Sequence, residues 1–163
     1  MKEFKYLGAS LILATIVLSA CVKEKNFPTT PVIAFKKYES YTTDSADCVI
    51  TFKDGDGDIG VLEGDTVSPN DFRLKYLYKD STDGVFKHFD DPSTLAMDTL
   101  FISYRVPNLT PEGQYKALDG EIRAKLRGLI YFPTHQIVKF EVTLFDRAGH
   151  RSNVVTTDEI VIP

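Results

Sequence analysis

The sequence contains no tryptophan, only two cysteines and only three histidines among its 163 residues. It also has no Cys-x-x-Cys pair, no His-Glu-x-x-His, no Gly-x-Ser-x-Gly and no phosphate-binding loop, the short motifs of redox, zinc, serine-hydrolase and nucleotide sites. The three histidines, His88, His135 and His150, stand singly. A lone histidine is more often structural or solvated than a ligand. We therefore expect a protein without a catalytic site.

One apolar run, from Leu7 to Val17, follows the charged start Met1-Lys2-Glu3-Phe4-Lys5. A charged start, a short apolar run and small residues at Ser19 and Ala20 are typical of a secretory signal peptide over residues 1–20. The stretch from Leu7 to Ala20 is too short to cross a bilayer, which takes about 20 apolar residues. We expect the chain to be exported and this segment to be removed.

The segment Leu18-Ser19-Ala20-Cys21 resembles the lipobox of bacterial lipoproteins. The resemblance implies that Cys21 receives a diacylglycerol and, after cleavage, an N-acyl chain such as palmitate. Several acyl chains anchor a protein stably, whereas one chain binds a membrane only marginally. The polar, proline-containing residues 21–30 then form a flexible tether between the lipid and a folded domain over residues 31–163.

The net charge and the remaining cysteine argue against two further features, a nucleic-acid partner and a disulfide. Removal of residues 1–20 takes away two lysines and one glutamate, so the formal net charge changes from -4 to -5. A mildly acidic body excludes nucleic acid as the expected partner, because nucleic-acid binding needs a concentrated basic patch. With Cys21 lipidated, Cys48 is the only thiol left, so no intramolecular disulfide forms. Cys48 alternates with Ile50 and Phe52, which predicts a buried position.

Period-two alternation of apolar and polar residues recurs along the domain and predicts strands without a long helix. The runs lie at about 32–38, 47–53, 71–79, 85–89, 99–106, 121–127, 138–145 and 154–162. We predict an all-β fold, an antiparallel β-sandwich of seven or eight strands, with a single closed sheet as the alternative. The residues expected to face the core are Cys48, Ile50, Phe52, Phe72, Leu74, Tyr76, Phe140, Val142 and Leu144.

The segment Asp146-Arg147-Ala148-Gly149-His150-Arg151-Ser152-Asn153 resembles the last turn of bacterial immunoglobulin-like and fibronectin-III-like domains. In that turn the glycine permits positive φ, and the Asp, Ser and Asn side chains bond the local backbone. The chain has His150 where the pattern usually has Asn. It also lacks the disulfide and core tryptophan of antibody domains. The resemblance implies an immunoglobulin-like sandwich without the antibody-type core.

The segment Asp54-Gly55-Asp56-Gly57-Asp58-Ile59-Gly60 directly follows the second predicted strand. Carboxylates at alternate positions in a glycine-rich loop supply the oxygen ligands that calcium selects. We predict a calcium site at Asp54, Asp56 and Asp58, with Glu63 and Asp65 as candidate additional ligands. A solvated acidic turn is the alternative. Asp146 would join only if the last hairpin lay at the same end of the sandwich, which the sequence leaves open.

The lipobox, the short tether, the Phe-x-Asp-Gly-Asp-Gly-Asp-Ile-Gly loop and the final Asp-Arg-Ala-Gly turn together resemble uncharacterised lipoproteins of the Bacteroidota. The resemblance implies an outer-membrane lipoprotein of the cell envelope. The leaflet stays open between the periplasmic face and the cell surface, because the sequence after Cys21 carries a single acid, Glu24. The O-glycosylation pattern of that group, Asp-Ser/Thr-aliphatic, matches at Ser45, Thr66 and Thr99.

Two further surfaces have alternative interpretations. Arg123, Lys125 and Arg127 share one face of a predicted strand, and either receive an anionic ligand or answer acids on neighbouring strands, which we favour. The apolar segment 129–133 is either an exposed partner patch or a cover over the core, and we favour the cover.

These features indicate a noncatalytic binding or accessory lipoprotein, bound to the membrane by its anchor and to an unidentified protein or glycan partner. The alternatives are an adhesion or structural component of an outer-membrane complex and a small glycan hydrolase. A hydrolase would need a pair of facing carboxylates in a cleft. The acids of this chain instead concentrate in one loop.

Overall fold

The computed structural model describes residues 26–68, 71–90, 99–128 and 132–162, so the predicted signal peptide and Cys21 lie outside the described residues. The described part contains strands and no helix, which confirms the all-β prediction. The strands are β1 (Val32–Thr42), β2 (Ser45–Asp54), β3 (Phe72–Lys79), β4 (Phe86–His88), β5 (Phe101–Tyr104), β6 (Leu118–Arg127), β7 (Ile137–Leu144), β8 (Val155–Thr156) and β9 (Ile160–Val161).

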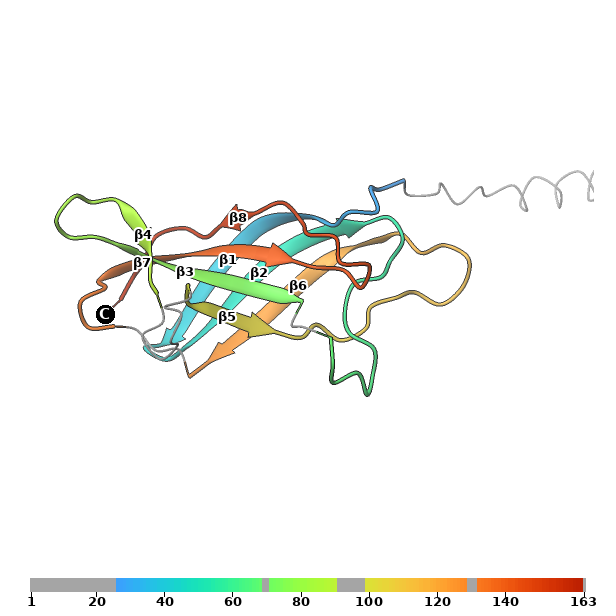
Figure 1. Ribbon diagram of the computed structural model, residues 1–163, viewed down its shortest axis with the longest axis horizontal. Coiled ribbons are helices and arrows are strands. Elements are labelled where there is room, and N and C mark those ends of the chain that lie inside the picture. The colour runs from blue at the N-terminus through green and yellow to red at the C-terminus, as the bar shows by residue number, and fades with distance from the viewer. Residues whose placement is uncertain (1–25, 69–70, 91–98, 129–131, 163) are drawn as a thin grey trace, which may run out of the picture.

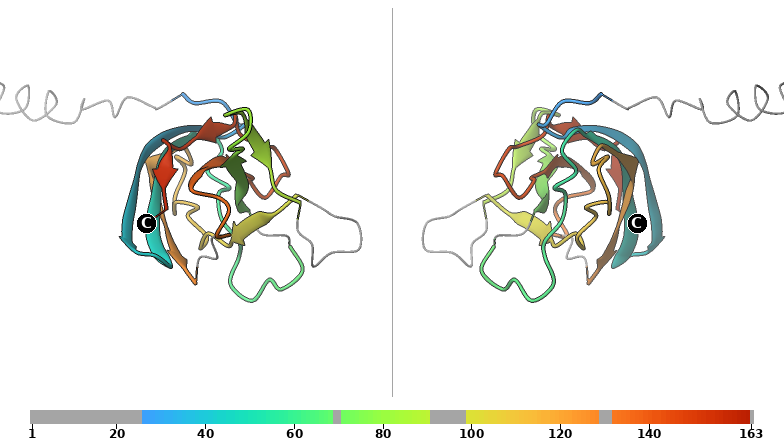
Figure 2. Two further views of the ribbon diagram at one scale, coloured as in Figure 1. Left: turned by 90° about the vertical axis from the view of Figure 1, so that its left-hand side faces the viewer. Right: turned by 90° about the vertical axis from the view of Figure 1, so that its right-hand side faces the viewer.

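The strands form two antiparallel sheets that pack face to face, as Figures 1 and 2 show. One sheet has the order β1-β2-β6, and the other has the order β4-β3-β7-β8, with β5 paired to β3 and β9 paired to β7. The predicted sandwich is therefore confirmed. The connection over residues 105–117 leads from β5 in the second sheet to β6 in the first.

The last predicted strand, 154–162, is divided into β8 and β9, both paired to β7. Thr157 lies between them, and its side chain replaces a backbone partner. The Thr157 hydroxyl accepts a hydrogen bond from the Phe140 N–H at 3.1 Å, while the Thr157 N–H donates to the Phe140 carbonyl at 3.0 Å. The interruption therefore leaves no unpaired polar group on Phe140.

The core consists of the inward-facing side chains of both sheets. All nine residues predicted to face it are at most 3% exposed. This agreement follows from the pleat of a strand, which sends alternate side chains to opposite faces. Cys48 lies opposite Ala124 in the first sheet, and Leu74 lies opposite Val142 in the second. The interpretation of Cys48 as a small buried hydrophobe is confirmed by its complete burial.

Two of the three basic side chains on one face of β6 form ion pairs with acids on the neighbouring strands, as predicted. Arg123 Nη1 lies 3.2 Å from Glu39 and 2.9 Å from Asp47, and Arg127 Nη1 lies 3.7 Å from Asp47. The hydrogen bond from Arg123 lowers the pKa of Asp47. These arginines are therefore committed to the sheet surface rather than arranged as an anion site.

The sandwich has two ends of different character. We call one the tether end, because the described chain enters there; it comprises the described residues 26–31, 55–68, 71, 105–117 and 145–153. The opposite end carries an aromatic cluster of Tyr76, Tyr78, Phe89, Phe132 and His135. Phe132, from the apolar segment 129–133, packs against the core there, as favoured above; residues 129–131 lie outside the described residues.

Candidate metal centre

The acidic loop, residues 54–60, begins at the last residue of β2, and its glycines allow two other segments of the chain to approach it closely. Gly57 has φ 69°, and a Cβ on it would lie 2.0 Å from the Lys116 carbonyl oxygen. A Cβ on Gly55 would lie 2.2 Å from the Phe27 carbonyl oxygen. The loop is therefore enclosed between the tether on one side and the 105–117 connection on the other.

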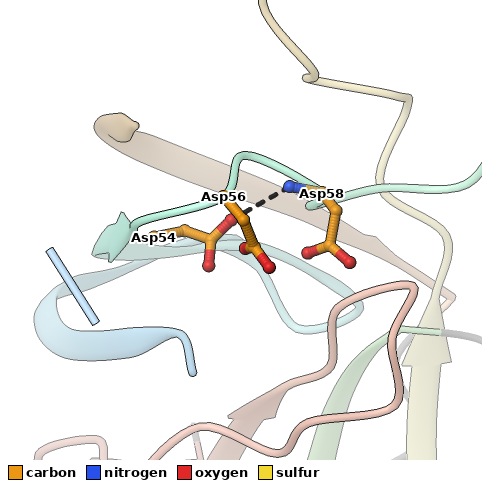
Figure 3. Close-up of side chains that lie close together, drawn as sticks. All are labelled: Asp54, Asp56 and Asp58. Carbon is orange, nitrogen blue, oxygen red and sulfur yellow. Dashed lines mark hydrogen bonds between the residues drawn. The ribbon is translucent and has the colours of Figure 1, made fainter. Parts of the chain in front are cut away.

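The three aspartates of this loop direct their carboxylates toward one another, as Figure 3 shows. One oxygen from each of Asp54, Asp56 and Asp58 lies within 4.8 Å of the others. The three differ in burial, since Asp54 is 0% exposed, Asp58 is half-buried and Asp56 is exposed. The structure thus brings together the three central residues of the predicted calcium site.

Each of the two less exposed aspartates uses one carboxylate oxygen to order the local backbone. Asp54 Oδ2 accepts a hydrogen bond from the Asp58 N–H at 3.1 Å, and Asp58 Oδ2 accepts one from the Ala148 N–H at 3.0 Å. The second oxygens, Asp54 Oδ1 and Asp58 Oδ1, are buried and have no hydrogen-bond partner. Buried polar atoms are nearly always satisfied by a protein group, an ordered water or an ion. A cation bound in the cluster would satisfy both oxygens at once.

The electrostatics of the cluster agree with this. Burial, reinforced by the negative charge of Asp56, raises the pKa of Asp54 to about 6. Burial also raises the pKa of Asp58, with Asp146 and then Asp56 adding to the rise. The ionised cluster is therefore destabilised by desolvation and like-charge repulsion, the two effects that a bound divalent cation reverses.

The final hairpin, whose turn contains residues 146–153, lies beside the acidic loop. The sequence left open whether the two lie at the same end of the sandwich, and in the structure they do. Asp146 forms an isolated bridge with Ile59, and the Arg147 N–H donates to the Asp58 carbonyl at 3.2 Å. The Arg147 guanidinium donates to the Gly60 carbonyl at 2.8 Å. The hairpin is thus fixed to the loop by backbone contacts and by one arginine.

Asp146 itself is engaged within the hairpin. Its Oδ1 accepts from the His150 N–H at 2.7 Å, and its Oδ2 lies 2.8 Å from His150 Nδ1. This pairing raises the pKa of His150. The predicted turn, in which the Asp side chain bonds the local backbone, is therefore present. The negative charge of Asp146 contributes to the raised pKa of Asp58, but the group of converging carboxylates does not include Asp146.

Glu63 and Asp65, the two candidate additional ligands, are not brought into the cluster. Asp65 caps its own turn, where its Oδ1 accepts from the N–H groups of Val67 and Ser68. The Ser68 hydroxyl donates to its Oδ2, and these bonds lower the pKa of Asp65 to about 2. Glu63 is exposed on the loop. The spacing Asp65-x-x-Ser68 is a local capping signal that could have assigned Asp65 to a turn.

The three candidate glycosylation residues differ in accessibility. Thr66 is exposed on the loop between β2 and β3. Ser45 begins β2, half-buried, with its hydroxyl 2.9 Å from that of Thr42. Thr99 is half-buried in a bridge to Asp90, and the preceding Asp98 lies outside the described residues. Thr66 is the most accessible acceptor of the three.

A small cavity beside the metal centre has two acids in its lining, Asp71 and Asp146, with Arg73 and Arg147. No sequence motif marks Asp71 or Arg73 as a site residue. The cavity encloses about 160 Å³, less than the several hundred Å³ of a usual ligand pocket. Both Asp146 oxygens face His150 donors, and Asp71 Oδ1 accepts from the Val106 N–H. Asp71 Oδ2 is buried and has no hydrogen-bond partner, so of these two acids only Asp146 has both carboxylate oxygens engaged.

Comparison with protein-family models, with curated proteins and with solved structures finds no match for this chain. Among the residues that the structure describes, no helix is long and apolar enough to span a membrane.

Proposed function

We propose that the protein is a noncatalytic, lipid-anchored module of the cell envelope whose folded body is stabilised by calcium at the tether end. The observation that carries the calcium assignment is the pair of buried, partnerless oxygens, Asp54 Oδ1 and Asp58 Oδ1, in a cluster of three converging carboxylates. Calcium is favoured over magnesium because it accepts six to eight oxygen ligands in irregular arrangements, whereas magnesium demands near-ideal octahedral geometry.

The anchor is assigned from the sequence. The predicted signal peptide ends at Ala20, directly before Cys21 in a lipobox-like segment, and diacylglycerol with an N-acyl chain on one residue suffices for stable attachment. The resemblance to Bacteroidota lipoproteins supports the outer membrane as the location. An immunoglobulin-like body is supported by the strand order, in which a sheet of β1, β2 and β6 packs on a sheet containing β3, β7 and the C-terminal strands.

A binding or accessory role is favoured over hydrolysis by the distribution of the acids. Those of the tether end gather in one loop or are bonded to backbone groups, and the cavity beside them is smaller than a sugar site. A protein or glycan partner at the envelope is therefore the proposed ligand class.

The anchor is tested by growing cells that express the full chain with radiolabelled palmitate and separating their membranes. Wild type and Cys48→Ala are expected to carry the label and to sediment with membranes. Cys21→Ala is expected to lose the label and to be released or left uncleaved. Cys48→Ala is the matched control, because Cys48 is the only other cysteine. Retention of label and normal processing in Cys21→Ala would refute the anchor.

A further inference from the structure

The chain leaves the fold directly beside the metal centre. The Pro28 carbonyl accepts a hydrogen bond from the Gly55 N–H at 2.8 Å, and the Lys53 ammonium lies 5.4 Å from the centre of the Phe27 ring. These contacts hold the tether against the acidic loop, at the right of Figure 1.

The length of chain between the anchor and the fold limits how far this end can stand from the membrane. Asn26 follows Cys21 by five residues, which span at most about 18 Å in any conformation. With Cys21 acylated, as proposed above, Asn26 therefore lies within that distance of the lipid headgroups and brings the tether end close to them. The aromatic cluster lies at the other end of the sandwich, one strand length from the point where the tether enters.

The tether end also presents apolar side chains to its surroundings. The exposed large hydrophobic residues on its loops and adjoining strand termini are Val32, Leu62, Val67, Tyr115 and Val154. Val67 is 91% exposed and Tyr115 is 56% exposed. Tyrosine is a residue that membrane proteins place at the headgroup level, because its ring is apolar and its hydroxyl is polar. Such loops suit a lipid surface better than open water.

We propose that the tether end docks on the bilayer surface, with Tyr115 at the headgroup level and calcium in the acidic loop as the bridge to lipid phosphates. The proposal rests on the proposed anchor and the proposed calcium site. Calcium takes six to eight oxygen ligands, and two of the six carboxylate oxygens in the cluster already accept backbone hydrogen bonds. The exposed position of Asp56 leaves one side of the ion open to phosphate oxygens.

The charge of the loop makes this docking depend on the ion. Without calcium, the exposed carboxylates of Asp56 and Glu63 are the ones that approach the anionic phosphates. Like charges repel over about one Debye length, ~8 Å at physiological ionic strength. With calcium bound, the cluster attracts the same phosphates. The lipid anchor holds the protein near the bilayer with or without calcium, and the bound ion sets the orientation of the protein.

The absence of tryptophan from the chain permits a direct test. Tyr115→Trp and Tyr41→Trp each introduce one tryptophan, at positions that are 56% and 55% exposed and lie at opposite ends of the sandwich. The acylated full-length proteins are reconstituted into vesicles of phosphatidylethanolamine and phosphatidylglycerol, with or without bromine on the acyl chains. Brominated chains quench only a tryptophan that reaches the headgroup–acyl boundary.

With calcium, Tyr115→Trp is expected to lose the larger part of its emission in brominated vesicles, and Tyr41→Trp is expected to keep its emission. A chelator, or the added Asp56→Asn substitution, should restore the emission of Tyr115→Trp while the protein stays attached. Equal quenching at both positions, or none at position 115 in attached protein, would overturn the docking. Quenching that a chelator leaves unchanged would overturn the calcium bridge. Failure to attach at all would instead refute the anchor.

Discussion

Replacement of Asp54 by asparagine is expected to stabilise the calcium-free protein at neutral pH. Asn keeps the shape of the side chain and an oxygen for the Asp58 N–H, while it removes a charge that is fully buried. The amide NH₂ of Asn would stand where Asp54 Oδ1 now lacks a partner, close to the carboxylates of Asp56 and Asp58. The repulsion between the buried Asp54 carboxylate and its neighbours would thus be replaced by amide donors beside carboxylate acceptors.

The size of the effect follows from the pKa of Asp54. A pKa raised from 3.8 to about 6 means that the ionised carboxylate is destabilised in the folded state by roughly 3 kcal/mol relative to the unfolded chain. For a domain of this length that corresponds to a rise of about 10 °C in Tm for the variant. The gain is an upper value, because the amide loses some conformational freedom to its new partners.

The pH dependence has a definite sign. Because the folded pKa of Asp54 lies above the unfolded value, the destabilisation is absent below about pH 4, where the group is protonated in both states. It develops as the pH rises to about 6 and stays constant above that value. The stability difference between Asp54→Asn and wild type should therefore grow over this interval. Acids elsewhere, such as Asp65, titrate equally in both proteins.

Calcium should cancel most of this difference in stability. An ion at one hundred times its Kd adds about 2.7 kcal/mol to the folded state. Wild type should gain that stability, and Asp54→Asn should not, because it lacks a charged ligand at the buried position. The assay is thermal unfolding by circular dichroism, with a chelator and with millimolar calcium, across the acidic to neutral range. Asp44→Asn, at an exposed acid in the β1–β2 turn, controls for the loss of one charge.

Two results together would refute the metal centre. One is a wild-type melting curve that calcium and chelator leave unchanged. The other is an Asp54→Asn variant that is no more stable than wild type without calcium at neutral pH. The acidic loop would then be only a solvated turn.

Two further predictions concern the loop and the core. Gly57→Ala should destabilise the fold by about 1–3 kcal/mol more than Gly84→Ala. Both glycines have φ near 70°, but only at Gly57 would the new Cβ meet a carbonyl, that of Lys116. Equal unfolding midpoints of the two variants in urea would contradict the close approach. The thiol of Cys48, buried and with its pKa raised to about 12, should react with a thiol reagent only as fast as the protein unfolds, and rapid labelling of the native mature protein would contradict its burial.

The faces of the strands could be predicted from the sequence because the side-chain period of a strand is a property of the backbone itself. Phe72, Leu74 and Phe140 were assigned to the core by alternation alone, and all three are fully buried. The cluster of acids in the loop could also be predicted from the sequence, since its three carboxylates lie within five consecutive positions. Local chemistry also explains why Asp65 is not a ligand. Its closeness in sequence to the acidic loop suggests one, but its serine partner, three residues away, holds it in a turn.

Only the tertiary structure decided which segments surround that loop and so which carboxylate oxygens lose water. The position of the final hairpin depends on the 105–117 connection, which joins the two sheets and has no periodic signal of its own. The burial of Asp54 and the contact from the Ala148 N–H to Asp58 arise from segments distant in sequence. Sequence determines which acids stand together, whereas burial by remote segments determines whether their oxygens are satisfied by water or need a cation.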